Sequence, residues 1–170
     1  PVHPERLAQF EKLLSREKRE LKESIMSREG EFRKRYGIAF PESRIDLIAR
    51  RMVDKGYDVN TVFEEVVEVQ RQVEEFERDF QQRNGIRLQF DGEAVDRITE
   101  MALEENMKGE MVCFRLLKDY EHGMKLIRDR MGRKEFVITK EAVDDPEGYL
   151  NRVIQEVYSR RFDLEAEGNG

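Results

Sequence analysis

The sequence predicts a mostly α, α+β protein, in which a long helical arm or hairpin precedes a small helical domain with two short β-strands. Three observations lead to this prediction. Apolar residues recur at helical spacing along most of the 170 residues, only two short segments alternate as strands do, and charged residues reach 40%. Average globular chains contain only about 25% charged residues, so long helices with solvated outer faces suit this composition better than one thick globule.

The predicted arm, residues 1–84, begins with a long helix from Pro4 to about Tyr36. Pro4 suits a first helical turn, where the missing N–H costs nothing. A break at 37–41 ends this pattern. A short helix follows, which we expect to be capped by Ser43 and to stop at Gly56. The apolar stripe of the long helix has gaps of three, four and seven and consists of Leu7, Phe10, Leu14, Leu21, Ile25 and Phe32.

The third helix of the arm carries the sharpest pattern in the chain. Asp58 or Asn60 can open it, and it ends at Asn84-Gly85. Its apolar residues alternate gaps of three and four over three heptads, as in a coiled coil. This stripe, the Val/Phe seam, begins at Val59. It can fold back on the first helix, which offers a mate within the chain, or it can pair with a partner protein. The candidate interface residues are Val62, Val66, Val69, Val73, Phe76 and Phe80.

The small domain is predicted over residues 85–162, followed by a flexible acidic tail at 163–170. Its two strands are IRLQF (86–90) and EFVIT (135–139), in which every second residue is apolar. Two short strands are stable in water only when helices cover one face. We therefore expect helices to pack on these strands.

Three helices are predicted around the two strands. The first is capped by Asp91, and the second follows a turn at 106–109 and ends at Gly132. The last begins at Asp145-Pro146. The expected core of this domain includes Val95, Ile98, Leu116 and Tyr120.

No complete active site is visible in the sequence. The two histidines, His3 and His122, have no ligand partners at the spacing that zinc requires, and Cys113 has no neighbouring histidine to make it a nucleophile. Neither a GxxxxGK[ST] phosphate loop nor a GxGxxG motif occurs. We therefore expect no catalytic residue, no metal site and no cofactor in this chain, which by itself is not an enzyme.

The charge and hydropathy of the chain limit the classes of partner that we expect it to bind. A net charge of -6 argues against nucleic acid, whose phosphates require a basic face. No segment approaches the roughly 20 apolar residues that span a bilayer. A single cysteine without a signal peptide predicts a cytoplasmic protein. We expect the partner to be protein, and no nucleic acid or membrane.

The turn before the second helix of the small domain is the one place where a ligand can be envisaged. Lys108-Gly109 runs directly into an apolar helical pattern. The opening of a helix offers free N–H groups and a positive dipole end, which suit an anion. Glu110 already supplies a negative charge there, so a plain structural corner is the favoured interpretation.

The order IRLQFDGEAVDRITEMALEENMKGEMVCFRLLKDY…KEFVITKEAV resembles the C-terminal small, or lid, domain of Clp-type AAA+ ATPases, the ClpX branch especially. The similarity covers roughly 85–143. It rests on a strand ending in Phe90, an acidic-capped helix, a Gly-headed helix and a VIT-type strand followed by Glu-Ala-Val. The resemblance implies the non-catalytic C-terminal part of a Clp-type unfoldase, which packs against neighbouring subunits of a ring and couples their nucleotide state. ATP and Mg²⁺ would then belong to the full-length protein, and the helical arm would be an insertion.

The resemblance also assigns the candidate nucleotide-contacting residues. In that family the Gly-headed helix carries Gly-Ala-Arg, and its arginine senses the phosphates of the nucleotide. Here the triplet is Gly109-Glu110-Met111, and Arg115 lies one turn further on. Methionine lacks the charged donors that phosphate sensing requires, so the sensor position is degenerate. The alternative is a stand-alone helical adaptor or scaffold that binds a partner through the Val/Phe seam.

Overall fold

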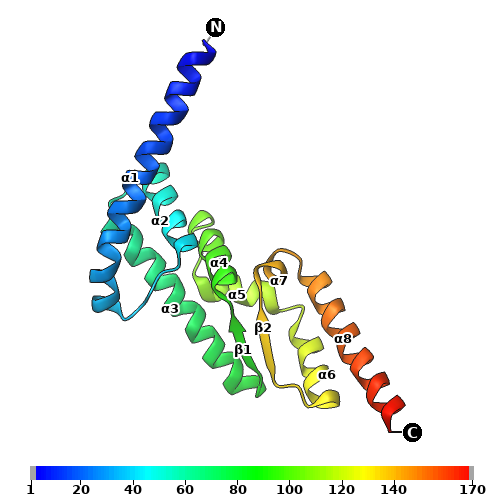
Figure 1. The fold of residues 1–170 in the computed structure, drawn as a ribbon. Coiled ribbons are helices and arrows are strands. Elements are labelled where there is room, and N and C mark those ends of the chain that lie inside the picture. The colour runs from blue at the N-terminus through cyan, green and yellow to red at the C-terminus, as the bar shows by residue number, and fades with distance from the viewer. Residues whose placement is uncertain (1–2, 169–170) are drawn as a thin grey trace. The chain divides into compact units, whose positions relative to one another are not determined.

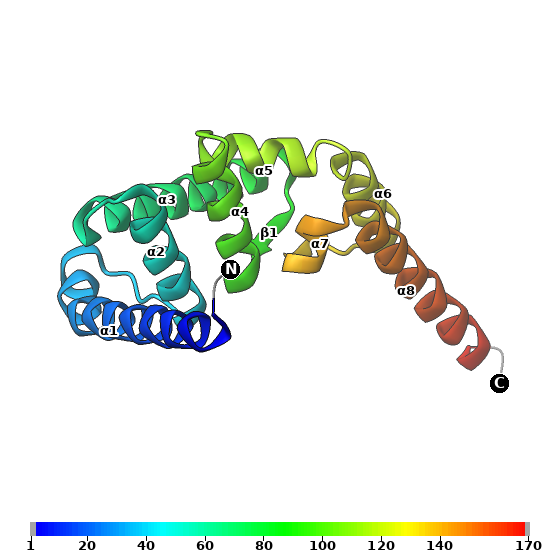
Figure 2. The same cartoon turned by 90° about the horizontal axis from the view of Figure 1, so that it is seen from above.

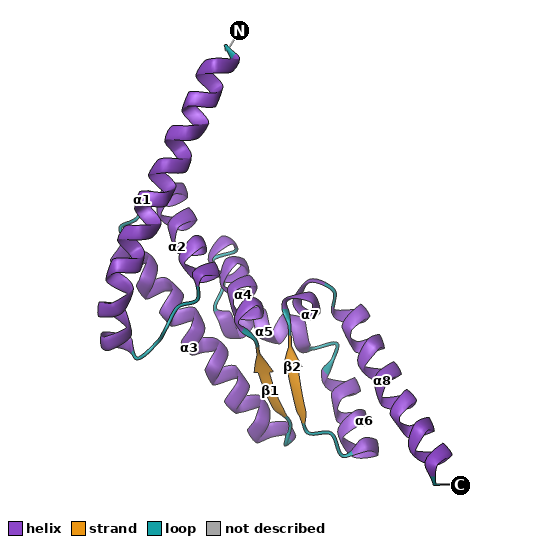
Figure 3. Cartoon of the chain, viewed as in Figure 1, coloured by secondary structure: helices purple, strands orange, loops and turns teal. Residues whose placement is uncertain are grey.

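A computed structural model describes residues 3–168 of the protein, apart from the side chain of Phe10. That residue of the predicted apolar stripe therefore lies outside the described part. Eight helices and two short strands make up this range (Figure 3), so the predicted mostly α, α+β class is confirmed. The chain divides into two compact units, Pro1–Val67 and Glu68–Gly170. The boundary lies inside the third helix, whereas the sequence placed it at the end of that helix, after residue 84.

The first unit contains α1 (Pro4–Tyr36), α2 (Glu42–Lys55) and the beginning of α3 (Val59–Asn84) (Figure 1). Its aromatic residues gather around Phe63. The ring of Phe32 stacks on Phe63 with 3.8 Å between centroids, and Phe40 meets Phe63 edge-on at 5.0 Å. These three rings join α1, the α1–α2 loop and α3 into one small core.

Two details of the first unit differ from the sequence prediction. The residue that precedes α2 as its N-cap is Pro41, so Ser43 lies within the helix and the predicted cap is wrong. The stripe of α1 is covered over its second half only. Ile25 is 1% exposed, whereas Leu7 and Leu14 remain 46% and 40% exposed. Among the described residues of this unit, the N-terminal half of the stripe is therefore left largely exposed.

The second unit is built around a two-stranded parallel sheet. β1 (Arg87–Phe90) pairs with β2 (Glu135–Ile138), with Arg87 opposite Glu135 and Phe90 opposite Ile138. Parallel strands require a long crossover. The crossover consists of α4 (Gly92–Glu104), α5 (Gly109–Leu117) and α6 (Glu121–Met131), and α7 (Lys140–Asp144) and α8 (Pro146–Glu167) follow β2.

The two strands alternate between buried and exposed residues, as the sequence predicted. The buried residues face the core that the helices complete, and the others remain open to solvent. The buried set is Leu88, Phe90, Phe136 and Ile138. Val95, Ile98 and Tyr120 join them as predicted, while Leu116 is partly buried at the margin of this core.

Side-chain caps explain why α4 and α8 begin where they do. The Asp91 carboxylate accepts the N–H of Ala94 at 2.8 Å at the start of α4. Asp145 accepts the N–H of Gly148 at 3.2 Å at the start of α8, where Pro146 occupies the first helical position. Such caps satisfy N–H groups that a helix leaves unpaired in its first turn. Both starts agree with the sequence prediction.

The segment after Gly109 is two helices rather than the single predicted one. The break falls at 118–120, where Tyr120 is only 2% exposed and its hydroxyl donates to the Ala142 carbonyl at 2.9 Å. Apolar spacing continues through the break, which is why the pattern does not reveal it. Helix α8 also continues to Glu167, so the tail predicted to be loose from Asp163 is helical with exposed side chains, as far as the structure describes it.

The second half of α3 belongs to the strand unit. Its apolar side chains enter the same core as the sheet and α4 to α8. The Glu77 carboxylate of α3 accepts the backbone N–H of Phe90 at 2.9 Å, on the side of β1 that does not pair with β2. This packing accounts for the position of the boundary between the two units.

Candidate functional site

The opening of α5, where the sequence placed the sensor-like triplet, is closely packed against α3. Gly109 is buried, and its backbone N–H donates to the Gln72 side-chain oxygen at 2.6 Å. A Cβ atom at position 109 would lie 3.0 Å from the Val69 carbonyl oxygen and 3.1 Å from Val69 Cγ1. The close approach of α3 therefore favours glycine here, and the first N–H of the helix is already satisfied.

The other three candidate residues differ in their exposure and in their partners. Met111 is 51% exposed and Glu110 is half-buried. Arg115 is engaged by Glu105, with 2.9 Å between Arg115 Nη1 and the carboxylate. The guanidinium lowers the pKa of the Glu105 carboxyl. Arg115, the one candidate residue whose cation could bind a phosphate, is thus paired with the Glu105 carboxylate from the turn before α5.

The Val/Phe seam is buried within this single chain along its whole length. Val62 and Val66 are 0% exposed and belong to the first unit. The later residues of the seam belong to the core of the second unit and lie with the strands. These residues are Val69, Val73, Phe76 and Phe80, all at most 7% exposed. A partner could bind the seam only after these cores had opened.

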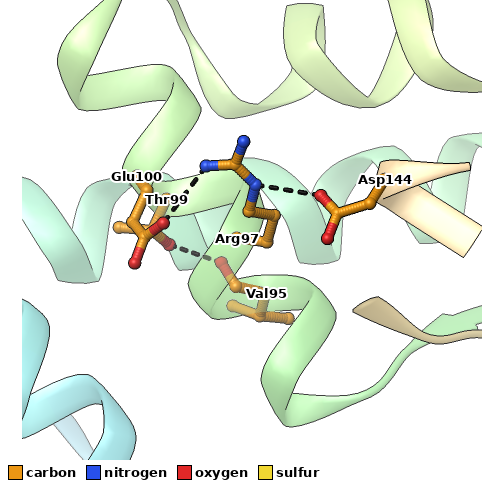
Figure 4. A network of polar contacts seen from close by, with 5 residues as sticks. All are labelled: Val95, Arg97, Thr99, Glu100 and Asp144. Carbon is orange, nitrogen blue, oxygen red and sulfur yellow. Dashed lines mark hydrogen bonds and ion pairs between the residues drawn. The ribbon is translucent and has the colours of Figure 1, made fainter. Parts of the chain in front are cut away.

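A polar network on the surface of the second unit ties α4 to α7 (Figure 4). Arg97 Nε donates to Asp144 at 3.0 Å and Arg97 Nη1 donates to Glu100 at 3.2 Å. On the buried side of the same helix, the Thr99 hydroxyl donates to the Val95 carbonyl at 2.7 Å. The network holds the short α7 against the crossover and has no nucleophile or acid–base pair.

Cys113 is packed in the core of the second unit. Cys113 is 0% exposed, and burial raises the pKa of its thiol, so the reactive thiolate is disfavoured. Within residues 3–168, no group of three or more histidine, cysteine or acidic side chains has the geometry of a metal site. No helix in the same range has the length and apolar character needed to cross a membrane.

The structure reveals two packing residues of α3 that the sequence did not suggest. Gln72 and Glu77 lie on α3 among many exposed polar residues, and nothing in the local pattern separates them from those neighbours. Their partners, Gly109 and Phe90, are distant in the chain. Near these two contacts, Gly85 and Gly109 were the features of the sequence that indicated a close turn of the chain.

Comparison of the chain with protein-family models, with curated proteins and with solved structures finds no match.

Proposed function

We propose that this chain is a lid-like, non-catalytic part of a Clp-type AAA+ ATPase. In this role the second unit packs against a neighbouring subunit and couples nucleotide state around a ring. The first unit is then an inserted arm that contacts protein. The chain itself hydrolyses no ATP, and any ATP and Mg²⁺ bind elsewhere in the full-length protein.

The order and the end points of the elements in the second unit carry this proposal. A strand ends at Phe90, a helix capped by Asp91 follows, and Gly109 begins the next helix. The second strand is followed by a helix that contains Glu141, Ala142 and Val143. Each of these features coincides with one on which the resemblance to the lid domain rests, and their apolar residues form one core.

The occupied opening of α5 favours a coupling role without direct nucleotide contact. Gln72 takes the first N–H of the helix, and Arg115 is paired with Glu105. A module that only transmits movement needs a rigid core and an outer surface, and it does not need a phosphate sensor.

The alternative is a stand-alone adaptor that binds a partner through the Val/Phe seam. The burial of Val73 and Phe76 counts against this version, since exposing them would disrupt the core of the second unit. An adaptor would therefore have to use another surface.

ATP turnover tests the proposal. The native protein would be purified through a tag at the end of its own coding sequence, and the 170-residue chain would be prepared in parallel. We expect ATP hydrolysis by the native protein and none by the 170-residue chain above buffer controls. Turnover that persists in the 170-residue chain after repurification would contradict the non-catalytic assignment. A native preparation without turnover would contradict the ATPase assignment.

A further inference from the structure

Two helices end and two strands begin at one end of the second unit (Figure 1). The backbone N–H of Arg87 donates to the Lys134 carbonyl at 2.7 Å, so the starts of β1 and β2 lie together. Arg128, in the last turn of α6, donates to the carbonyl of Asn84, the last residue of α3. The last turns of both helices and the first residues of both strands therefore form one surface.

This surface is positively charged in a unit that is otherwise acidic. Residues 83–87 and 128–135 include six basic and two acidic residues, whereas the rest of the second unit, within 68–170, includes 11 basic and 22 acidic residues. The formal charge is thus +4 on this surface and -11 over the rest of the unit. We call these residues the basic end. Its basic residues are Arg83, Arg87, Arg128, Arg130, Arg133 and Lys134.

The two acidic residues of the basic end neutralise only part of its charge. Asp129 pairs with Arg128 at 2.8 Å. Glu135 lies 3.7 Å from Arg87, and these two side chains are 76% and 64% exposed. An exposed pair at this distance contributes little, so Arg87 remains accessible to a second carboxylate.

The other four cations of the basic end have no carboxylate partner within residues 3–168. The guanidinium groups of Arg83 and Arg133 donate to backbone carbonyls only. The side chains of Arg130 and Lys134 are exposed. A carboxylate from outside the chain can therefore pair with these cations without breaking an ion pair of the protein, and such charge-assisted hydrogen bonds are the stronger kind.

The helix ends explain only part of this charge. The negative end of the helix dipole stabilises basic side chains in the last turn. This effect accounts for Arg83, Arg128 and Arg130, which lie in the last turns of α3 and α6. It does not account for Arg133 and Lys134, which lie beyond the end of α6. The additional cations indicate a surface that attracts an anionic partner.

The surroundings favour a short acidic segment of protein over nucleic acid. A polyanion longer than the basic end would meet the acidic remainder of the unit, which would repel it. Surfaces that bind single-stranded nucleic acid also combine cations with aromatic side chains on which the bases stack. The basic end contains no aromatic residue. A few carboxylates on one peptide match both its charge and its small extent.

We propose that the basic end binds a short acidic segment of a partner protein. The carboxylates of this segment pair with the four cations that have no carboxylate of their own, and opposite charge steers the segment to this end of the unit. The surface is separate from the lid-like function proposed above, and neither proposal depends on the other.

Fluorescence anisotropy of a labelled octaglutamate peptide, titrated with the 170-residue chain, tests this proposal. We expect saturable binding that weakens as the salt concentration rises. The double variant Arg130→Glu with Lys134→Glu replaces two attractions with two repulsions. It should weaken binding of the peptide at least about tenfold.

The double variant Lys108→Glu with Lys118→Glu is the matched control. It makes the same change in net charge at two exposed lysines that flank α5, which Figure 2 shows between α4 and α6. The contact of α5 with Gln72 precedes Arg83 by about 16 Å along α3, and α6 spans a similar length. At about 0.1 M salt the Debye length is only about 10 Å, so the control should alter the affinity less than about twofold.

The outcomes distinguish the proposed partner from others. Circular dichroism would verify that both double variants fold. A chain that does not bind octaglutamate, or a control variant that weakens binding as much as Arg130→Glu with Lys134→Glu does, would overturn the proposal. An oligothymidylate of equal charge that bound more tightly than octaglutamate would overturn it in favour of nucleic acid.

Discussion

The backbone N–H of Gly109 donates to the side-chain oxygen of Gln72 at 2.6 Å, and this contact joins the opening of α5 to the middle of α3. It pairs the first N–H group at this helix opening, which an anion could otherwise use. The helix opening is therefore part of the core packing of the second unit.

Gly109→Ala should destabilise the second unit by about 1–3 kcal/mol. The added Cβ atom would lie 3.0 Å from the Val69 carbonyl oxygen, and a helix backbone cannot move aside as a flexible side chain can. Urea denaturation followed by circular dichroism measures the change. Gly92→Ala is the control, because a Cβ atom at position 92 meets nothing within 4 Å. Equal stability of Gly109→Ala and Gly92→Ala would show that α3 and α5 are not so close.

Glu77 should make the stability of the second unit depend on pH. Burial is the main cause that raises its pKa above the ordinary value of 4.5, although the hydrogen bond from the Phe90 N–H opposes this. As pH rises from about 4.5 through the raised pKa, the unfolded chain loses this proton before the folded chain does. The free energy of unfolding therefore falls across that window.

The variant Glu77→Gln isolates this effect, since its amide oxygen can still accept the Phe90 N–H. We expect the variant to gain stability relative to the natural chain as pH rises from 4 toward 7, measured as the urea midpoint at each pH. Glu75→Gln, an exposed position on the same helix, is the control. A difference that stays constant with pH would contradict the assignment to Glu77.

Val73→Asp should unfold the second unit. Val73 is 1% exposed in its core, and a buried unpaired carboxylate costs about 4 kcal/mol or more, against a typical domain stability of about 5–15 kcal/mol. Loss of slow amide hydrogen exchange in β1 and β2 would report the unfolding. Val53→Asp, at a valine that is 61% exposed, should leave exchange unchanged. A folded Val73→Asp variant that merely lost a protein partner would favour the adaptor alternative.

Arg97→Ala should loosen α7 at a cost of about 0.5–1 kcal/mol. The substitution removes both the 3.0 Å bond to Asp144 and the 3.2 Å bond to Glu100, and α7 is only five residues long. Hydrogen exchange of the α7 amides should accelerate. Arg87→Ala, which removes a longer 3.7 Å contact between two well-exposed side chains, should have no measurable effect. Unchanged exchange in α7 would mean that apolar packing alone holds it.

Apolar periodicity predicted most of the fold, but it failed for contacts between residues that are distant in the sequence. The helices with clear apolar stripes, the strand alternation and the caps at Asp91 and Asp145 were all predicted because each is a local feature. The break before α6 was missed, because Tyr120 fits the apolar spacing of an unbroken helix. The short α7 was missed as well, since five residues hold too little pattern.

The candidate site illustrates the same limit. A regular seam on α3 predicted that its residues would be buried, but it could not indicate which elements would cover them. The sequence pattern singled out Gly109 as the start of a helix. Its partner Gln72 lies 37 residues earlier, on a helix with many similar polar residues. Contacts of this kind depend on how elements pack, and one sequence holds no local signal for them.

The mass of the native polypeptide tests the central claim most directly. An immunoblot of the source cells, with an antibody raised against this chain, would measure it without purification. The proposed function predicts a band heavier than 20.3 kDa by about 20 kDa or more, the mass of roughly one further domain that would carry the phosphate loop. A native band at 20.3 kDa would contradict the claim that this chain is the lid-like part of an ATPase.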